Sequence, residues 1–241
     1  MPGRLGYGEG VKQTEERAPT QSWWTPLRKL AGRVRRLFGI DIYDVFRRVV
    51  PQDSAPLETT DYRFAWGRAE DIATCTEHHT ELDQGERELG IRRLGLGHRV
   101  VVAFHGETPV FTMWANPRHV NVPRLMKRKL GDHQWFIYKA YTSPEHRGRK
   151  LYENGMRFVL AEMRAAGKTE LIGYAHVKKR ISRKGLARLS FESIGLVRQF
   201  RGPGIVWTRV SRDLACYFPE TTPRSGILDD AMASPLEPTT P

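Results

Sequence analysis

A basic, glycine-containing turn between a strand and a long helix constrains this chain most. Trp135–Thr142 (WFIYKAYT) is aromatic and β-branched enough for a strand, and the turn SPEHRGRK follows it. The helix predicted from about Lys150 to Ala166 has apolar residues at helical intervals and stops at Gly167. A further strand, Glu170–Val177, comes next. Strand, helix and strand in succession indicate an α/β domain with a crossover connection.

The flanking segments extend the same sheet. Tyr62–Gly67 reads as a strand, and a helix follows whose early Glu70 and Asp71 suit its N-terminal dipole. A hairpin is predicted over 99–114, a short helix over 181–189, and two strands around the RGPG turn between Phe191 and Val210. The order β-α-β-β-β-α-β-α-β-β predicts a mixed α/β fold, with a central six- or seven-stranded sheet covered by helices on both faces.

The ends of the chain differ in composition from this domain. Residues 1–60 are predicted to hold a flexible start, a basic amphipathic helix within Trp23–Val50 that ends at Gly39, and a Pro-rich linker. That basic segment either lies on an anionic membrane or docks on its own domain. The domain itself is expected over 61–212. Residues 213–241, rich in Pro, Ser and Thr, are expected to be disordered.

Charge and cysteine content limit the partners and the compartment. The 39 Lys and Arg residues exceed the 27 Asp and Glu residues by 12, so phosphorylated ligands, anionic lipid or nucleic acid would be attracted. The chain has two cysteines and no apolar run near the ~18 residues of a membrane span. Its first residues lack the apolar core of a signal peptide. A cytoplasmic protein is expected, with peripheral contact at the inner face of the membrane as one option through residues 23–50.

The turn itself has the chemistry of an anion site. Pro144 ends the strand ladder because it has no amide hydrogen, and Gly148 lets a ligand approach the main chain. The first N–H groups of the following helix point into the turn, and Arg147, Arg149 and Lys150 add positive charge. These features favour a phosphate ligand.

PEHRGRKLY resembles the acyl-CoA loop of the GNAT superfamily of N-acetyltransferases, often written P-x-x-R-G-x-G. KRISRKGLARLSF (Lys179–Phe191) is similar to a second motif of that superfamily, and RFAWGRAEDI to its opening strand and helix. The resemblance covers about 61–210. It implies acetyl-CoA or another acyl-CoA as co-substrate and an oxyanion-binding amide near residues 140–142. The residues that it implies for acyl-CoA binding are Tyr141, Thr142, His146, Arg147, Gly148, Arg149, Lys150, Leu151 and Ser182. Cys75, His78 and His79 lack the spacing of metal ligands, so no metal is expected.

Four positions depart from the superfamily's pattern. Glu145 stands where Gln or Arg is common. Lys150 stands where a second small residue is usual, so it either crowds the loop or pairs with a phosphate oxygen. Lys179 replaces an Asn. Leu186 stands where many members have a Tyr that protonates the leaving thiolate, and a leucine cannot donate a proton.

The general base and acid have several candidates. His176 has the most suitable unperturbed pKa, about 6.5, and Tyr174 shares its strand face. Tyr138 is a further candidate, although Tyr138 and Tyr141, three residues apart on one strand, are expected on opposite faces. Each of these side chains could instead be an ordinary packed residue.

Two functions follow from these patterns. The first is an acyltransferase in which an amine attacks the thioester directly, the acceptor being an amino sugar or nucleotide sugar, a small amine or a protein amino group. The alternative is a catalytically inactive GNAT-like module that binds nucleic acid or another polyanion. The missing Tyr at 186, the absence of a carboxylate from the strand WFIYKAYT and the net charge favour that alternative. The helical basic face of Arg180, Arg183, Lys184 and Arg188 is either a solvated surface or a site for the 3′-phosphate of coenzyme A, an anionic substrate or RNA.

Overall fold

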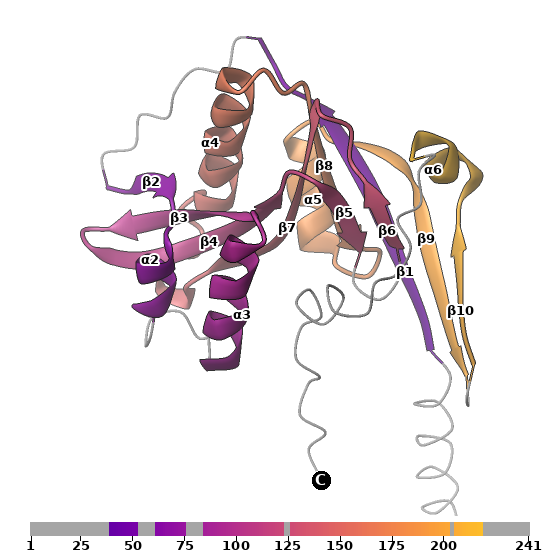
Figure 1. Cartoon of the computed structure of the whole chain (residues 1–241), viewed down its shortest axis with the longest axis horizontal. Helices are drawn as coiled ribbons and strands as arrows, with labels where there is room; N and C mark the ends of the chain where they lie inside the picture. Colours follow the sequence, from indigo (N-terminus) through magenta and orange to yellow (C-terminus); the bar gives the residue numbers. More distant parts are fainter. Residues whose placement is uncertain (1–38, 53–60, 76–83, 123–125, 203–204, 219–241) are drawn as a thin grey trace, which may run out of the picture. The chain divides into compact units, whose positions relative to one another are not determined.

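The computed structural model describes residues 39–52, 61–75, 84–122, 126–202 and 205–218, all within one compact unit (Figure 1). The predicted basic helix within 23–38, the linker core and most of the C-terminal tail lie outside these residues. Eight strands form one sheet in the order β10-β9-β1-β8-β7-β4-β3-β2. Its strands are β1 (Gly39–Val49), β2 (Arg63–Trp66), β3 (Arg99–His105), β4 (Thr108–Asn116), β7 (Gln134–Thr142), β8 (Glu170–His176), β9 (Glu192–Gly202) and β10 (Ile205–Val210).

The sheet is mixed, as predicted, but within the described residues it has eight strands rather than six or seven. Among the described strands of this sheet only β7 and β8 pair in parallel, because α4 (Leu151–Ala165) connects them by a crossover. Two short strands that the sequence did not predict, β5 (His119–Val122) and β6 (Met126–Lys129), form a separate hairpin.

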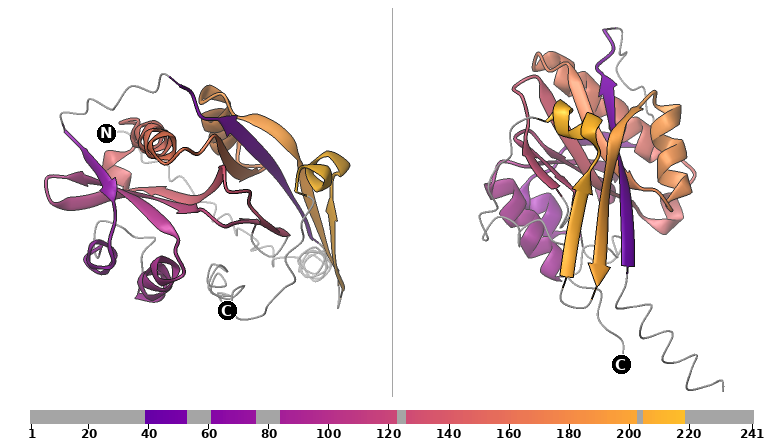
Figure 2. Two further views of the ribbon diagram at one scale, coloured as in Figure 1. Left: turned by 45° about the horizontal axis from the view of Figure 1, so that its top comes forward. Right: turned by 90° about the vertical axis from the view of Figure 1, so that its right-hand side faces the viewer.

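Helices lie on both faces of the sheet (Figure 2). On one face α4 and α5 (Arg180–Arg188) enclose a core with Phe111, Met156 and Leu186. On the other face Ile72 of α2 (Ala69–Ala73) and Leu214 of α6 (Arg212–Tyr217) are buried in a second core, and α3 (Gln84–Gly95) packs there as well. The predicted helices on both faces are therefore present.

Strand β1 corrects the expected domain boundary at residue 61. It pairs with β8 on one side and β9 on the other, so it lies inside the sheet. Val45 and Phe46 are buried in opposite cores, as a central strand requires. The start at residue 61 is thus too late. The tail expected from residue 213 is also wrong over its first residues, because Leu214 and Phe218 are buried and α6 is helical.

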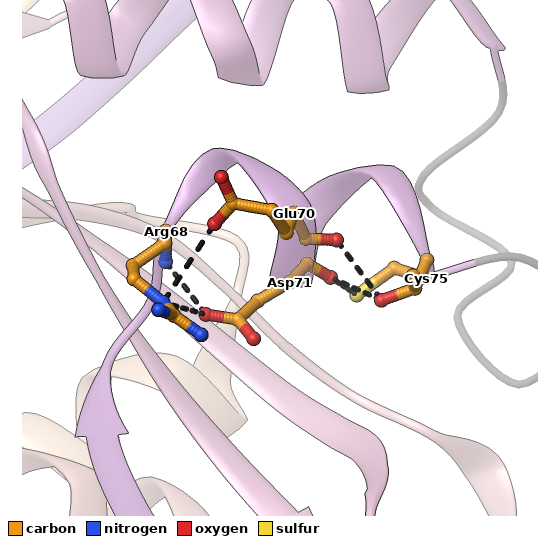
Figure 3. Close-up of polar contacts among 5 residues, drawn as sticks. Arg68, Glu70, Asp71 and Cys75 are labelled. Atoms are coloured by element: carbon orange, nitrogen blue, oxygen red, sulfur yellow. Dashed lines mark hydrogen bonds and ion pairs between the residues drawn. The ribbon is translucent and has the colours of Figure 1, made fainter.

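The N-terminus of α2 has the acidic first turn that the sequence predicts. The Arg68 N–H donates to Asp71 Oδ2 at 2.7 Å, and the Arg68 guanidinium lies 3.7 Å from Glu70 (Figure 3). Cys75 Sγ donates to the Asp71 carbonyl at 3.0 Å, and burial raises the pKa of this thiol to about 12. The thiol is therefore a protonated, structural group.

Helix α3 is absent from the sequence prediction because its inner stripe is not apolar. Glu86, Gly90 and Arg93 are buried at helical spacing, and Arg93 is only 1% exposed. A Cβ at Gly90 would lie 3.3 Å from the Trp114 ring, so glycine allows this helix to approach the sheet closely. Hydrophobic periodicity cannot detect a helix whose buried face is charged and small.

Candidate active site

The centre of the candidate site is a fork between β7 and β8. Their parallel ladder has three pairs and ends at Phe136 and Ile172. Beyond that point β7 stays paired with β4 as far as Thr142, while β8 stays paired with β1 as far as His176. We call 137–142 of β7 and 173–176 of β8 the two arms of the fork.

The fork makes main-chain amides available. In an antiparallel ladder every second residue directs its N–H and C=O toward the partner strand, and the residues between direct theirs to the other side. On the 137–142 arm that other side is where β8 has parted from β7. This arrangement supplies N–H groups of the kind that can stabilise an oxyanion, in the region 140–142 that the resemblance implies.

A β-bulge at Lys139 changes which side chains face which way. Trp114 pairs with Tyr138, while Met113 pairs with Ala140, so Lys139 is an extra residue on β7 and has a φ of +46°. Tyr141 then lies opposite Thr112, on the same face as Trp114 and Tyr138. In a regular strand, residues three apart point to opposite faces. The extra residue of the bulge shifts this alternation by one, so the expectation that Tyr138 and Tyr141 point to opposite faces is wrong.

Lys139 is tied to α3 through a buried charge network. Its Nζ lies 2.6 Å from Glu86 Oε2, and the Arg93 NH1 lies 3.4 Å from the same oxygen. The Arg93 guanidinium also lies 5.3 Å from the centre of the Trp114 ring and 5.9 Å from that of Tyr138. These contacts hold the strained backbone of the bulge against α3. A strained conformation persists only where the surrounding structure stabilises it in this way.

The basic loop directly follows the β7 arm. A short 3-10 turn, η1 (Pro144–His146), leads to Gly148 at φ +78° and Lys150 at φ +58°, and α4 begins at Leu151. Among the described residues, no carbonyl accepts a hydrogen bond from the N–H of Gly148, Arg149 or Lys150. Free amides and the N-terminus of a 15-residue helix make this turn suitable for an anion.

Lys150 keeps the left-handed conformation that a glycine would adopt without cost. It is the N-cap residue of α4, its ψ is 20°, and its side chain is exposed. The backbone of Lys150 thus adopts the conformation typical of a glycine, while its side chain is exposed to solvent.

The other loop residues divide into anchors and exposed cations. Leu151 is buried in the α4 core, and Arg147 Nε donates to the Thr142 carbonyl at 3.2 Å. His146 Nδ1 lies 3.1 Å from the Tyr62 hydroxyl, and its ring lies 5.2 Å from that of His105. Arg147 and Arg149 are exposed, so two guanidinium groups accompany the free amides.

Helix α5 brings the second motif toward the start of α4. A Cβ at Gly185 would lie 3.6 Å from the Tyr152 ring, in the first turn of α4. Ser182 is exposed one helical turn earlier. Arg180, Arg183, Lys184 and Arg188 are all exposed, and Arg183 also lies 3.2 Å from the buried Asp44. Leu186 is 2% exposed in the core, so the position of the missing Tyr is a packing position here.

His176 is poorly placed to act as a base. Its Nδ1 accepts a hydrogen bond from the Lys178 N–H at 3.1 Å, and its Nε2 lies 3.4 Å from Asp41 Oδ1. Both ring nitrogens are therefore occupied within the fold. The Arg201 guanidinium also contacts Asp41, at 2.5 Å, which makes His176 part of a structural polar cluster on β1, β8 and β9.

Tyr138 and Tyr174 are the first residues on their face beyond the end of the β7–β8 ladder. Both rings stack on Phe136, at centroid distances of 5.7 Å and 5.8 Å. Burial raises the pKa of both phenols well above the usual value, so both remain protonated at neutral pH. The structure thus brings Tyr138 and Tyr174 together next to the end of the β7–β8 ladder, whereas both ring nitrogens of His176 contact other groups of the fold.

Several site residues were not identified from the sequence. His98 contacts the Tyr138 hydroxyl directly, Asn116 contacts His98, and Lys139 forms the bulge. Nothing in the local sequence marks them, because they meet only when β3, β4 and β7 pair. In the described part of the chain, no group of three His, Cys, Asp or Glu side chains is placed to hold a metal ion. Among the described helices, none has both the length and the apolar character needed to cross a bilayer.

Comparisons with known proteins support the fold only. No protein-family model and no curated protein sequence matches this chain. A GNAT-family acetyltransferase from Colwellia psychrerythraea superposes with a TM-score of 0.47 at 13% identity, over 74% of this chain and 62% of that one. A GCN5-related glucosamine N-acetyltransferase region of a fungal multi-domain β-N-acetylglucosaminidase gives a TM-score of 0.50 at 12% identity, over 72% of this chain and 22% of that one.

A functionally unknown conserved protein from Staphylococcus epidermidis is similar to the same degree, with a TM-score of 0.47 at 12% identity over 71% of this chain. This chain covers 66% of that protein, and so less than two thirds of each of the three. At such identities the likeness concerns architecture alone, and the superposition with a TM-score of 0.50 shows a GNAT-like fold.

Proposed function

We propose that this protein is an acyltransferase that moves an acetyl or other acyl group from acyl-CoA to an amine. One observation carries the proposal: the β7–β8 ladder ends at Phe136 and Ile172, and the β7 arm leads directly into a turn at the start of α4 whose amides donate to no carbonyl of the described residues. A fork beside an anion-binding turn suits a long thioester with a diphosphate at one end.

Each part of the site has a role in this proposal. The amides of 148–151, with Arg147, Arg149 and Lys150, would bind the diphosphate. The alternate amides of the 137–142 arm would bind the oxygen of the thioester carbonyl as it becomes an oxyanion. The amine would attack the carbonyl carbon directly, which requires no covalent enzyme intermediate and therefore no nucleophilic side chain.

The amine must lose a proton during the reaction, and we do not assign this step to His176. Because both nitrogens of His176 are occupied, we propose that the amine loses its proton through water or after the attack, rather than to this ring. A His176→Gln variant should accordingly keep most of its turnover.

The direct test is release of coenzyme A thiol in the presence of a panel of amines, including amino sugars, small polyamines and peptides. The proposal expects acceptor-dependent thiol release with at least one class. The contrary result is absence of release with every class combined with salt-dependent binding of RNA or DNA, which would favour the binding-module alternative. A Gly148→Val variant, whose side chain at φ +78° would block the loop, provides the control.

A further inference from the structure

Exposed apolar side chains gather at one end of three neighbouring strands. Among the described residues, eight large apolar side chains are exposed, and five of them lie where β1, β9 and β10 run side by side (Figure 2). These five, between 38% and 65% exposed, are Ile40 of β1, Phe200 of β9, and Ile205, Val206 and Trp207 of β10. We call them the apolar patch. Apolar side chains scattered singly are ordinary on a protein surface, whereas a group of this kind indicates an interaction site.

The strand register shows that the apolar patch occupies both faces of the sheet. Ile40 pairs with Phe200, and Phe200 pairs with Trp207, so these three side chains form a row on one face. Ile205 lies two residues before Trp207 and extends that face, whereas Val206 points to the other face. Strand β10 is also the outer strand of the sheet. Apolar groups therefore surround this end of the sheet instead of forming one flat surface.

Positively charged side chains border the apolar patch. Arg198 and Arg209 form the next pair on the face of the row, and Arg201 pairs with Val206 on the other face. All three arginines are exposed. Asp41 contacts Arg201, but residues 196–202 of β9 and 205–210 of β10 include no Asp or Glu. This end of the sheet therefore attracts a partner with negative charge.

The turn before α5 adds cations close to Ile40. The Val177 N–H donates to the Ile42 carbonyl at 2.9 Å, so the chain leaves β8 beside β1, two residues from Ile40. The three residues that follow are exposed cations: Lys178, Lys179 and Arg180. The apolar patch is thus bordered by positive charge on the β1 side as well as on the β9–β10 hairpin.

We propose that the apolar patch and its bordering cations bind an anionic lipid surface, with Ile205 and Trp207 inserted at the boundary between headgroups and acyl chains. Apolar side chains on both faces suit a medium that surrounds the end of the sheet, and tryptophan favours that boundary. The cations would contact the anionic headgroups. The inference does not depend on acyl transfer, because none of these residues belongs to the fork or to the turn before α4.

Three other occupants fit these observations less well. A second copy in a two-fold interface would bring the exposed arginines of both copies together. Residues 23–38 of this chain include five Arg and Lys residues and no Asp or Glu, so they repeat the charge of the patch. Single-stranded nucleic acid stacks on aromatic rings, whereas three of the five patch residues are aliphatic. An anionic lipid surface complements both the charge and the aliphatic side chains.

Co-sedimentation of the full chain with vesicles tests the inference. Phosphatidylcholine vesicles that contain about a third phosphatidylglycerol should bind the wild type, and pure phosphatidylcholine vesicles should bind it much more weakly. In an Ile205→Ser/Trp207→Ser variant, the partition coefficient should fall about 10-fold or more, because two large apolar groups no longer enter the interface. Arg198→Gln and Arg209→Gln should each lower it about fivefold.

Ile91→Ser is the matched control. Ile91 is also an exposed apolar residue, but it belongs to α3, which packs on β4, and β7 and β8 separate β4 from β1. This substitution should leave vesicle binding unchanged. Because every substituted side chain is exposed, all the variants should keep the melting temperature of the wild type.

Several results would overturn the inference. One is a wild type that does not bind the anionic vesicles, and another is equal binding by Ile205→Ser/Trp207→Ser, which would place the contact elsewhere in the chain. A clear fall in the melting temperature of that variant would mean that another part of the chain covers the patch. Loss of a dimer in light scattering, or of RNA affinity, with vesicle binding intact would assign the patch to that partner instead.

Discussion

Replacing Lys150 by glycine should stabilise the protein and weaken acyl-CoA binding at the same time. Lys150 has φ +58°, and a left-handed conformation costs a non-glycine residue about 1 to 2 kcal/mol. Glycine removes that cost but adds about 0.5 to 1 kcal/mol of chain entropy in the unfolded state. The net gain is about 0.5 to 1 kcal/mol, which raises the melting temperature by about 1 to 4 °C.

The same change removes an ammonium group from the loop. A charge-assisted hydrogen bond to phosphate is worth about 1.5 to 3 kcal/mol when shielded, and about 1 kcal/mol at an exposed position such as this one. We therefore expect the Kd for acetyl-CoA to rise about fivefold, as measured by isothermal titration calorimetry.

Lys150→Ala separates the two effects. Alanine keeps the Cβ and hence the backbone cost, but it lacks the ammonium group, so it should bind acetyl-CoA as weakly as the glycine variant without its gain in melting temperature. Lys150→Arg should match the wild type in both measurements. A glycine variant less stable than the alanine variant would refute the argument from backbone strain, and unchanged affinity in both would refute the phosphate contact.

Three further predictions concern the helix contacts and the buried charges. Gly155→Val should destabilise the fold by about 1 to 3 kcal/mol in urea titrations, because a Cβ there would lie 2.6 Å from the Phe111 ring. Glu86→Ala should cost about 3 to 5 kcal/mol, since it leaves the Arg93 cation buried without its carboxylate partner. Lowering the pH from about 6.5 to about 4 should reduce the free energy of unfolding by up to about 3 kcal/mol through His98. The reason is that His98 is protonated in the unfolded chain over this range, whereas its lowered pKa keeps the ring largely neutral in the folded protein.

Each of the three has a contrary outcome. A Gly155→Val protein as stable as the wild type would mean that α4 can shift away from the sheet. An Arg93→Met/Glu86→Leu double variant should recover stability relative to Glu86→Ala, and failure to recover would contradict the charge argument. The His98→Gln protein should lack the acid-dependent loss assigned to His98, and an identical loss in that variant would assign it to other groups.

The sequence predicts the elements whose residues are local and periodic. These elements are the β7 strand, the Pro144–Lys150 turn, α4 and β8. They can be predicted because strand alternation, turn residues and the apolar stripe of a helix are each visible within a short stretch of sequence. Strand β1 was not predicted to belong to the sheet, since a central strand that is buried on both faces lacks alternation and follows a basic helical pattern.

The geometry of the candidate site depends on strand pairing that no local pattern reveals. A single extra residue at Lys139 places Tyr138 and Tyr141 on one face, which reverses the expectation from strand periodicity. His98, Asn116 and Tyr138 lie far apart in the chain and meet only through the order of β3, β4 and β7. The basic turn between β7 and α4 could thus be predicted from the sequence, whereas the contact of Tyr138 with His98 could not.

The central claim, that the loop before α4 binds the diphosphate of acyl-CoA, is tested most directly by the melting temperature of the full chain in millimolar acetyl-CoA. A ligand that binds only the folded state at about 100 times its Kd adds about 2.7 kcal/mol to the unfolding free energy. We expect a clear rise in melting temperature for the wild type and a much smaller one for Gly148→Val. An unchanged melting temperature for the wild type would contradict the account.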